Sequence, residues 1–229
     1  MTLQPIYLLR FIYTVILLGI SFSIGIKIAS KYFEHKTRVF LLVGITAIIV
    51  SEPWWVTPID AMLRFLGETP LPENVSQFIG AVGLPVGIFT WLFAITDLIY
   101  NNNQKIILII SAFYCGFFEV LFIPLSFTYP DMREHLPSLL IIGGYMFSFL
   151  IVVLVTGLLF ARESLKSDEP TLRLKAQFLR VAFISYFFAG MGVMAQIFDF
   201  MVSIFLIISA FTFYFGFALP KKIEKIFIK

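Results

Sequence analysis

The sequence predicts an all-α membrane protein, a bundle of seven transmembrane helices, from two observations. Of the 229 residues, 59% are hydrophobic and only 14% are charged, and the mean hydropathy is +0.94. A soluble domain carries roughly 25% charged residues, so lipid must take the place of the missing polar surface. The hydrophobic residues also form long runs without the alternation of barrel strands, which favours helices. A disulfide-bonded secreted scaffold is excluded, because Cys115 is the single cysteine.

Seven apolar segments are long enough to cross a membrane, since a helix needs about 20 residues to span a hydrocarbon core roughly 30 Å thick. In chain order they are 6–29, 39–56, 77–100, 106–129, 138–161, 178–198 and 200–219. We expect the first to be a retained helix rather than a signal peptide, because Lys27 stands where a cleavage site needs a small residue. The last two form one continuous stretch that is too long for a single crossing, so we place a hairpin turn at Asp199.

The basic residues predict the orientation, because cytoplasmic segments of membrane proteins are enriched in lysine and arginine. With the N-terminus outside and the C-terminus inside, the outer segments hold only Arg10, Arg64 and Arg133. The inner segments then hold all the others, namely Lys27, Lys31, Lys36, Arg38, Lys105, Arg162, Lys166, Arg173, Lys175, Arg180, Lys221, Lys222, Lys225 and Lys229. The same asymmetry favours an odd number of spans.

Two connections are longer than the others. The outer segment 57–76 contains apolar residues at helical spacing and three prolines, which predicts a short amphipathic helix followed by a braced loop. The inner segment 162–179 is charged, and Glu169-Pro170-Thr171 indicates a turn before a basic helix start. Neither segment is long enough for a second domain, so residues 1–229 form one transmembrane domain. The chain has no convincing internal repeat, which lowers support for the commonest transporter architectures.

The sequence lacks the residues that several known membrane-protein cofactors and catalytic sites require. The last span has no lysine for a retinal Schiff base, and His35 and His135 lie in connections rather than in spans where they could hold haem or zinc. Motifs of intramembrane proteases are also missing. We therefore expect no cofactor, no metal and no nucleic-acid partner. No motif supports an enzyme, although the residues alone leave that possibility open.

Glu119 is the first candidate for a functional residue, because it lies near the middle of the fourth span. Ionisable groups at this depth are costly, and they usually face the interior of the bundle or water. We expect the carboxyl group either to be protonated or to have a hydrogen-bond donor nearby. A neutral acid bonded to a neighbouring helix, a ligand, ion or proton site, and a group facing lipid all stay open.

A second cluster of candidates lies near the outer ends of the first two spans. Glu52 precedes Pro53, which removes a backbone donor and is expected to kink the helix. Trp54 and Trp55 follow, either as an interfacial aromatic belt or as a roof over an outward-facing cavity. Arg10 and Glu52 lie at similar depth on successive helices, so we predict that they pair, which would neutralise two costly charges.

A third group lies near the inner ends of the spans. Asp97 stands at a depth similar to that of Lys27, Arg38 and Lys105, which favours a structural ion pair. The alternative is that these residues couple the bundle to a cytoplasmic partner. Glycines at Gly80, Gly83 and Gly87, at 143–144 and at 190–192 predict close helix packing within the bundle.

The end of the chain, Phe-Tyr-Phe-Gly-Phe-Ala-Leu-Pro-Lys-Lys-Ile at 213–223, resembles the last span of a known family. It is similar to the exit of the seven-helix sensor modules at the N-terminus of membrane histidine kinases. That family closes an aromatic span with a Gly/Ala-Phe-x-x-Pro step and a basic segment leading into cytoplasmic domains. The number of spans and the orientation agree with it. Because the sequence ends at Lys229 without a kinase domain, we expect the output either to be a separate protein or to have been lost.

We therefore interpret the chain as a seven-helix sensor or receptor-like protein of the cell membrane with an outward-facing polar cavity. A change at Glu52 or Glu119 would shift helix packing, and a cytoplasmic signalling protein would detect the shift at the inner ends of the last three spans. The alternative is a small transporter or ion channel with Glu119 on the ion path. The lipid bilayer is the one partner that composition alone requires.

Overall fold

The computed structural model describes residues 5–129, 135–195, 199–217 and 219–228, and these are helical apart from short connections, with no strand among them. They divide into two compact units, Met1–Tyr145 and Met146–Lys229, each described below by itself. Helix α7, Leu136–Leu165, contributes its first part to unit 1 and the rest to unit 2.

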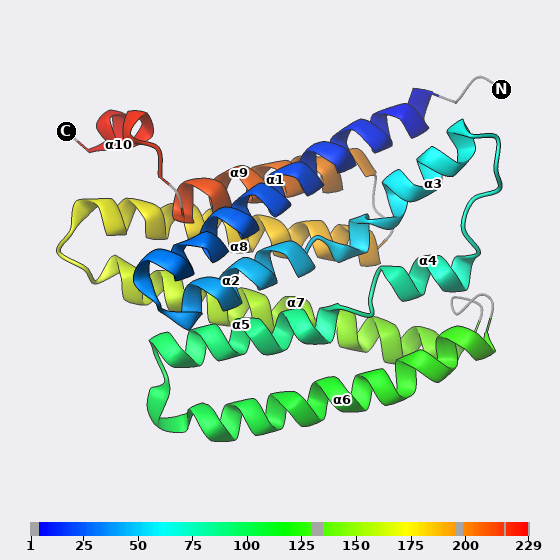
Figure 1. Cartoon of the computed structure of the whole chain (residues 1–229), viewed down its shortest axis with the longest axis horizontal. Coiled ribbons are helices and arrows are strands. Elements are labelled where there is room, and N and C mark those ends of the chain that lie inside the picture. The colour runs from blue at the N-terminus through cyan, green and yellow to red at the C-terminus, as the bar shows by residue number, and fades with distance from the viewer. Residues whose placement is uncertain (1–4, 130–134, 196–198, 218, 229) are drawn as a thin grey trace. The chain divides into compact units, whose positions relative to one another are not determined.

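Unit 1 is a row of helices in which each long helix packs on the next one along the chain. Helix α1 packs on α2, α2 on α5 and α5 on α6, while α3 lies against α1 and α4 against α6 (Figure 1). The helices are α1 (Pro5–His35), α2 (Arg38–Ile49), α3 (Val56–Phe65), α4 (Glu73–Ile79), α5 (Leu84–Leu98) and α6 (Gln104–Thr128). Single 3-10 turns, Glu52–Trp54 and Asn101–Asn103, precede α3 and α6.

The backbones of α1 and α2 approach each other closely at two glycines. A Cβ atom added to Gly44 would lie 2.6 Å from the carbonyl oxygen of Gly25, and one added to Gly25 would lie 2.7 Å from that of Gly44. Both positions therefore require glycine, as in other membrane helices that cross at small residues. The two glycines lie in different spans, so the spacing within either span does not single them out.

Unit 2 contains the rest of α7 together with α8 (Pro170–Met194), α9 (Asp199–Phe217) and α10 (Lys221–Phe227). Helix α8 packs along α9, and Ser209 donates a hydrogen bond to the carbonyl oxygen of Ala182 at 3.0 Å. Against α7, a side chain at Gly190 would meet Leu150. Of the glycines expected to pack closely, Gly83, Gly87, Gly190 and Gly192 do so. A Cβ at Gly80 would make only ordinary contacts, and one at Gly143 or Gly144 would meet nothing within 4 Å.

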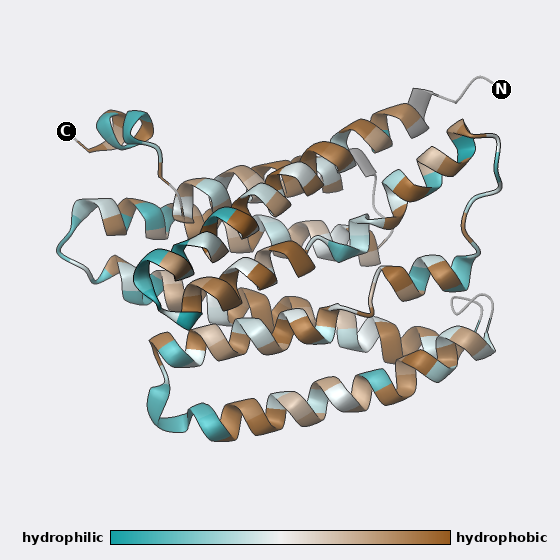
Figure 2. Ribbon diagram, viewed as in Figure 1, coloured by the Kyte–Doolittle hydropathy of each residue, from teal (hydrophilic) through white to brown (hydrophobic). Residues whose placement is uncertain are grey.

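Five helical segments are long and apolar enough to cross a membrane, and the number rises to seven if each of two bent helix pairs counts as one span. Figure 2 shows hydrophobic residues along most of the length of these helices, with hydrophilic residues gathered at the α1–α2 and α5–α6 connections and on α10. The chain thus has the composition and helix lengths of a multi-pass helical membrane protein.

Three expected segments differ from the helices that form. The second, 39–56, stops as α2 at Ile49, and the chain continues into α3 after a bend of 48°. The third, 77–100, is two helices, α4 and α5, separated at 80–83. The sixth starts at Pro170 rather than at 178, because proline is well suited to the first turn of a helix and the basic residues after it are helical too.

Two local expectations concern turns and short helices. The amphipathic helix expected within 57–76 is confirmed as α3, which extends from Val56 to Phe65. Asp199, expected at a hairpin turn, is the first residue of α9. The connection before it, 196–198, lies outside the described residues.

Candidate functional site

Two acidic residues, one at each end of the α2–α5 contact in unit 1, organise the polar groups of this region. The Asp97 end is the end where α2 begins and α5 finishes. The Glu52 end is the end where α2 finishes and α5 begins. The two ends differ in how completely their acids are hydrogen-bonded.

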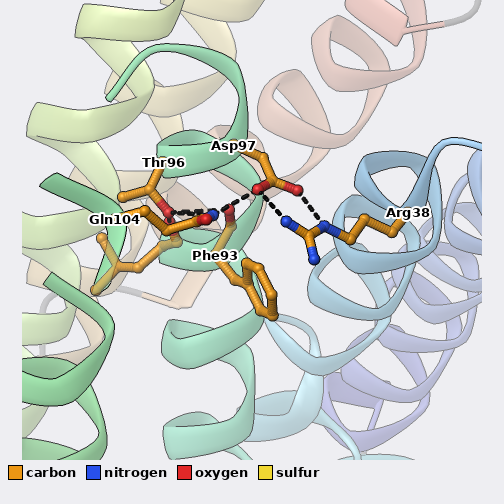
Figure 3. A network of polar contacts seen from close by, with 6 residues as sticks. Arg38, Phe93, Thr96, Asp97 and Gln104 are labelled. Atoms are coloured by element: carbon orange, nitrogen blue, oxygen red, sulfur yellow. Dashed lines mark hydrogen bonds and ion pairs between the residues drawn. The ribbon is translucent and has the colours of Figure 1, made fainter. Parts of the chain in front are cut away.

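At the Asp97 end, the carboxylate holds the guanidinium group of Arg38 in a two-point contact. Arg38 Nε donates to Oδ2 of Asp97 at 2.6 Å and Nη2 donates to Oδ1 at 2.7 Å (Figure 3). The guanidinium carbon also lies 4.7 Å from the ring centroid of Phe93. Bidentate geometry and a cation–π contact fix the orientation of the arginine as well as its charge. The expected ion pair of Asp97 is therefore confirmed, with Arg38 as its basic partner.

A third helix joins this contact through Gln104, the first residue of α6. Its Nε2 donates to Oδ1 of Asp97 at 2.5 Å and lies 3.3 Å from Oγ1 of Thr96 (Figure 3). Both carboxylate oxygens of Asp97 are thus satisfied, and α2, α5 and α6 are connected at one point. We refer to Arg38, Asp97 and Gln104 as the clamp.

The other two residues proposed for this end, Lys27 and Lys105, are both exposed. The contacts recorded for Asp97 are with Arg38 and Gln104. A coupling role for Lys27 and Lys105 stays a prediction.

Between the two ends, α2 and α5 share one buried hydrogen bond. The hydroxyl groups of Thr46 and Thr90 lie 2.9 Å apart, and each also donates or can donate to a carbonyl oxygen in its own helix. Threonines in membrane helices commonly bond across to a neighbour in this way. The contact was not predicted, because nothing in the sequence distinguishes these threonines from others in the spans.

At the Glu52 end, the carboxyl group is buried, with the residue only 3% exposed. Its Oε1 accepts a hydrogen bond from the backbone N–H of Gly83 at 2.7 Å, at the start of α5, where the helix dipole favours negative charge. A Cβ on Gly83 would lie 2.7 Å from Oε2, so only glycine allows the carboxylate to pack this closely. Within the part of the chain that the structure describes, the buried Oε2 has no hydrogen-bond partner.

Two helix breaks meet at this end. Pro53 stands in the 3-10 turn after α2, and Gly80 stands in the break between α4 and α5. A Cβ on Gly80 would lie 3.7 Å from the Cα of Pro53, so the two breaks are in contact. Proline removes a backbone donor, as the sequence predicted for Pro53, whereas the break before α5 was not expected.

The remaining candidates at the outer end occupy different surroundings. Trp55 donates from Nε1 to Oγ of Ser51 at 3.1 Å, and its ring lies against that of Phe22 on α1. Trp54 and Arg10 are half-buried. The Glu52 carboxyl accepts its hydrogen bond from the backbone N–H of Gly83, and its pair with Arg10 stays a prediction.

Glu119 extends from α6 toward the same region. Its Oε2 is buried and has no hydrogen-bond partner among the described residues, and its carboxyl group interacts electrostatically with that of Glu52. Cys115, one turn earlier on α6, lies with its sulfur 3.4 Å from the carbonyl oxygen of Pro85 and also interacts with Glu119. Of the two alternatives expected for Glu119, a protonated carboxyl or a nearby donor, no hydrogen bond from a donor to Oε2 is found in the described chain.

Aromatic rings line the side of α6 next to Glu119. Phe118 stacks on Phe122 at 5.0 Å between ring centroids and on Tyr145 of α7 at 3.5 Å. Phe78 of α4 stacks on Phe122 at 6.1 Å, and Tyr114 stacks on Tyr145 at 5.1 Å. We call these five residues the aromatic stack. They surround one flank of the acid with apolar surface, which makes its charged form costly.

No group of three or more metal-ligating side chains occurs among the described residues. Comparisons with protein-family models, with curated proteins and with solved structures found no match to the chain. The chemical character of the site therefore rests on two carboxyl groups, the buried Glu52 and the half-buried Glu119, each with one buried oxygen that lacks a partner in the described region.

Proposed function

We propose that the protein is a sensor in the cell membrane, in which protonation or cation binding at Glu52 and Glu119 changes helix packing. The proposal includes seven spans with the N-terminus outside, where the bent α2–α3 pair contributes one and α9 contributes the last. A cytoplasmic signalling protein is the proposed reader of the change. The resemblance of residues 213–223 to sensor modules supports the same interpretation.

The single observation behind the proposal is that Glu52 and Glu119, on different segments, each have one buried carboxyl oxygen without a hydrogen-bond partner in the described region and interact electrostatically. Two carboxylates that repel each other, each with an unpartnered buried oxygen, cannot both stay charged at low cost in apolar surroundings. A proton or a cation between them removes the repulsion. Its loss would drive the two groups apart and move α6 relative to the break between α2 and α3.

The difference between the Asp97 end and the Glu52 end suggests that the movement is restricted to the Glu52 end. The clamp connects α2, α5 and α6 at the Asp97 end with every carboxylate oxygen bonded. The Glu52 end has helix breaks and fewer bonds. A change in charge at Glu52 and Glu119 would therefore open this end while the clamp keeps the other end together, which defines two states of one bundle.

The test uses the reconstituted protein with spin labels on α3 and α6, measured across a range of pH. We expect the distance between the labels to change with pH in the wild type and to stay constant in Glu119→Gln, because glutamine keeps the size but cannot ionise. Glu68→Gln, which alters an exposed acid, is the matched control and should behave as the wild type. An unchanged distance in the wild type at every pH would overturn the proposed switch.

Orientation needs a separate measurement. Cysteines placed between residues 162 and 169 should react with a membrane-impermeant reagent only from the inside, and a cysteine at Glu73 should react only from outside. Cys115 is buried and does not compete for the reagent. The proposed orientation would be rejected if both positions reacted from the same side, or if each reacted from the side opposite to the expected one.

A second candidate function is a small transporter or ion channel with Glu119 on the ion path. The meeting of two broken helices favours it, because discontinuous helices form the binding sites of many transporters. Flux decides between the two functions. Vesicles loaded with a pH-sensitive or cation-sensitive dye should show no protein-dependent signal for a sensor, whereas a flux abolished by Glu119→Gln would establish transport.

A further inference from the structure

Helix α10 leaves the bundle of unit 2 almost at a right angle. The axes of α9 and α10 differ by 92°. A helix perpendicular to a membrane-spanning helix lies in the plane of the membrane surface, where amphipathic helices bury one face at the level of the headgroups. The direction of α10 therefore places it at the interface at the end of α9.

Two contacts with α8 keep α10 in this direction. Thr171 Oγ1 donates to Oε1 of Glu224 at 2.9 Å, and the rings of Phe178 and Phe227 meet edge to face with centroids 5.9 Å apart. Glu224 is the single acid of α10, and its carboxylate is engaged with α8. The acid therefore lies on the face of α10 that contacts α8, and not on the opposite face.

The free face of α10 is basic and apolar at once. Lys221, Lys222 and Lys225 are all exposed. Ile226 is 65% exposed, and it follows Lys222 by four residues, which places the two side chains on the same face of the helix. Exposed apolar side chains beside a cluster of lysines are characteristic of segments that bind anionic membranes.

Other charges near the start of α8 do not offer an equivalent cluster. Lys166 is held by Glu163 at 2.7 Å, and the exposed acids Asp168 and Glu169 precede the first turn of α8. In contrast, the three lysines of α10 have no ion pair within the described residues. These lysines lie together at 221–225, whereas the exposed arginines of unit 2, Arg162, Arg173 and Arg180, are spread along α7 and α8.

From this arrangement, we propose that α10 is a docking site for anionic phospholipid headgroups, with its lysines facing the headgroups and Ile226 inserted between them. This function is independent of the proposed switch at Glu52 and Glu119. A membrane accounts for both the direction of α10 and its exposed isoleucine. Each lysine close to an anionic surface strengthens binding by roughly five-fold, so three lysines are enough to hold a short helix that is already attached to the bundle.

The experiment places an environment-sensitive fluorophore on α10. The full chain carrying Cys115→Ser and Ile226→Cys is labelled and reconstituted into phosphatidylcholine vesicles with or without phosphatidylglycerol. We expect a blue-shifted emission and stronger quenching by brominated acyl chains only when phosphatidylglycerol is present. High salt should reverse both effects, because it screens exposed charges.

Two variants complete the test. Replacing Lys221, Lys222 and Lys225 together by glutamine should abolish the difference between the two vesicle types. The matched control replaces the exposed residues Arg162, Arg173 and Arg180 by glutamine and should keep the difference. Equal spectra of the unsubstituted helix in both vesicles, or an unchanged difference in the lysine variant, would overturn the proposal. If the fluorophore is shielded only when a soluble protein is added, α10 binds a protein instead of lipid.

Discussion

The Asp97 end and the Glu52 end connect the same two helices, and each does so with a carboxyl group that is largely removed from solvent. At the Asp97 end, the acid side chain is 11% exposed, and both of its oxygens accept hydrogen bonds from Arg38 or Gln104. At the Glu52 end, one oxygen accepts a bond from Gly83, whereas the other has none within the described residues. At the Asp97 end, the ion pair with Arg38 connects the helices. At the Glu52 end, the nearby acid Glu119 repels the charged form of Glu52.

The difference shows that burial alone does not assign a role to an acid in a membrane helix. Paired with an arginine in bidentate geometry, a carboxylate can be stable in its charged form. Placed near another carboxylate, it depends on a proton or a cation. The residues that surround each acid, rather than its depth, decide between the two roles.

The largest effect is expected from Gly83→Ala at the Glu52 end. The added methyl group would lie within 3 Å of the Glu52 carboxylate, so either the hydrogen bond or the helix start must give way. We expect a loss of about 2 kcal/mol in unfolding free energy, measured in detergent micelles.

The matched control for that change is Gly116→Ala, where a Cβ meets nothing within 4 Å and alanine should stabilise α6 by up to about 1 kcal/mol. Combining Gly83→Ala with Glu52→Ala should cost less than the sum of the single changes, because the methyl group then has room. Equal effects of the two glycine substitutions would contradict the close packing at Gly83.

A smaller effect is expected from Asp97→Ala at the clamp. The change removes the acceptor of Arg38 and Gln104, but the Arg38 side chain is 58% exposed and can recover its hydration. We therefore expect a loss of about 1 kcal/mol, decreasing at high salt. Glu163→Gln, which breaks the exposed pair with Lys166, serves as the control and should change the unfolding free energy by less than about 0.5 kcal/mol.

Glu119→Gln should change stability at low pH by less than about 0.5 kcal/mol, because glutamine keeps the size of the neutral acid. In the wild type, we expect the melting temperature to fall as pH rises, since the charged carboxylate is more costly to bury than the neutral form. That slope should disappear in the variant. Identical pH profiles for both proteins would make Glu119 a packing residue.

A further effect concerns the predicted pair of Arg10 and Glu52. Arg10→Ala should be rescued in part by Glu52→Gln, because both charges of the pair are then removed. The bond from Gly83 also holds the Glu52 carboxyl, so we expect a modest coupling energy of about 1 kcal/mol in a double-mutant cycle. Strictly additive losses would reject the pair.

The parts of the fold that follow from hydrophobic periodicity and length could be predicted. The long apolar runs predicted the helices, Pro53 predicted the break after α2, and the spacing of apolar residues in 57–76 predicted α3. The break between α4 and α5 was missed, because glycines inside an apolar run are typical of both a packed helix and an interrupted one. Helix α8 was expected too late, because its first turns are basic and do not resemble a membrane span.

The candidate site was predicted only as a set of residues. Glu52, Glu119 and Asp97 could be singled out because acids are rare in apolar segments. Their partners could not, because Gly83, Gln104 and Thr90 are ordinary residues that become important through contacts between distant segments. Similar depth suggested Arg10 for Glu52, and this pair stays a prediction, because depth does not determine the rotation of a helix about its axis.

The aromatic stack has a consequence for spectroscopy. Parallel rings at these separations have coupled electronic transitions, and the coupling between Phe118 and Tyr145, 3.5 Å apart, depends steeply on distance and angle. The near-ultraviolet circular dichroism of the protein should therefore contain a tyrosine band that originates beside Glu119. That band provides an intrinsic signal for the immediate neighbourhood of the acid, without any label or substitution.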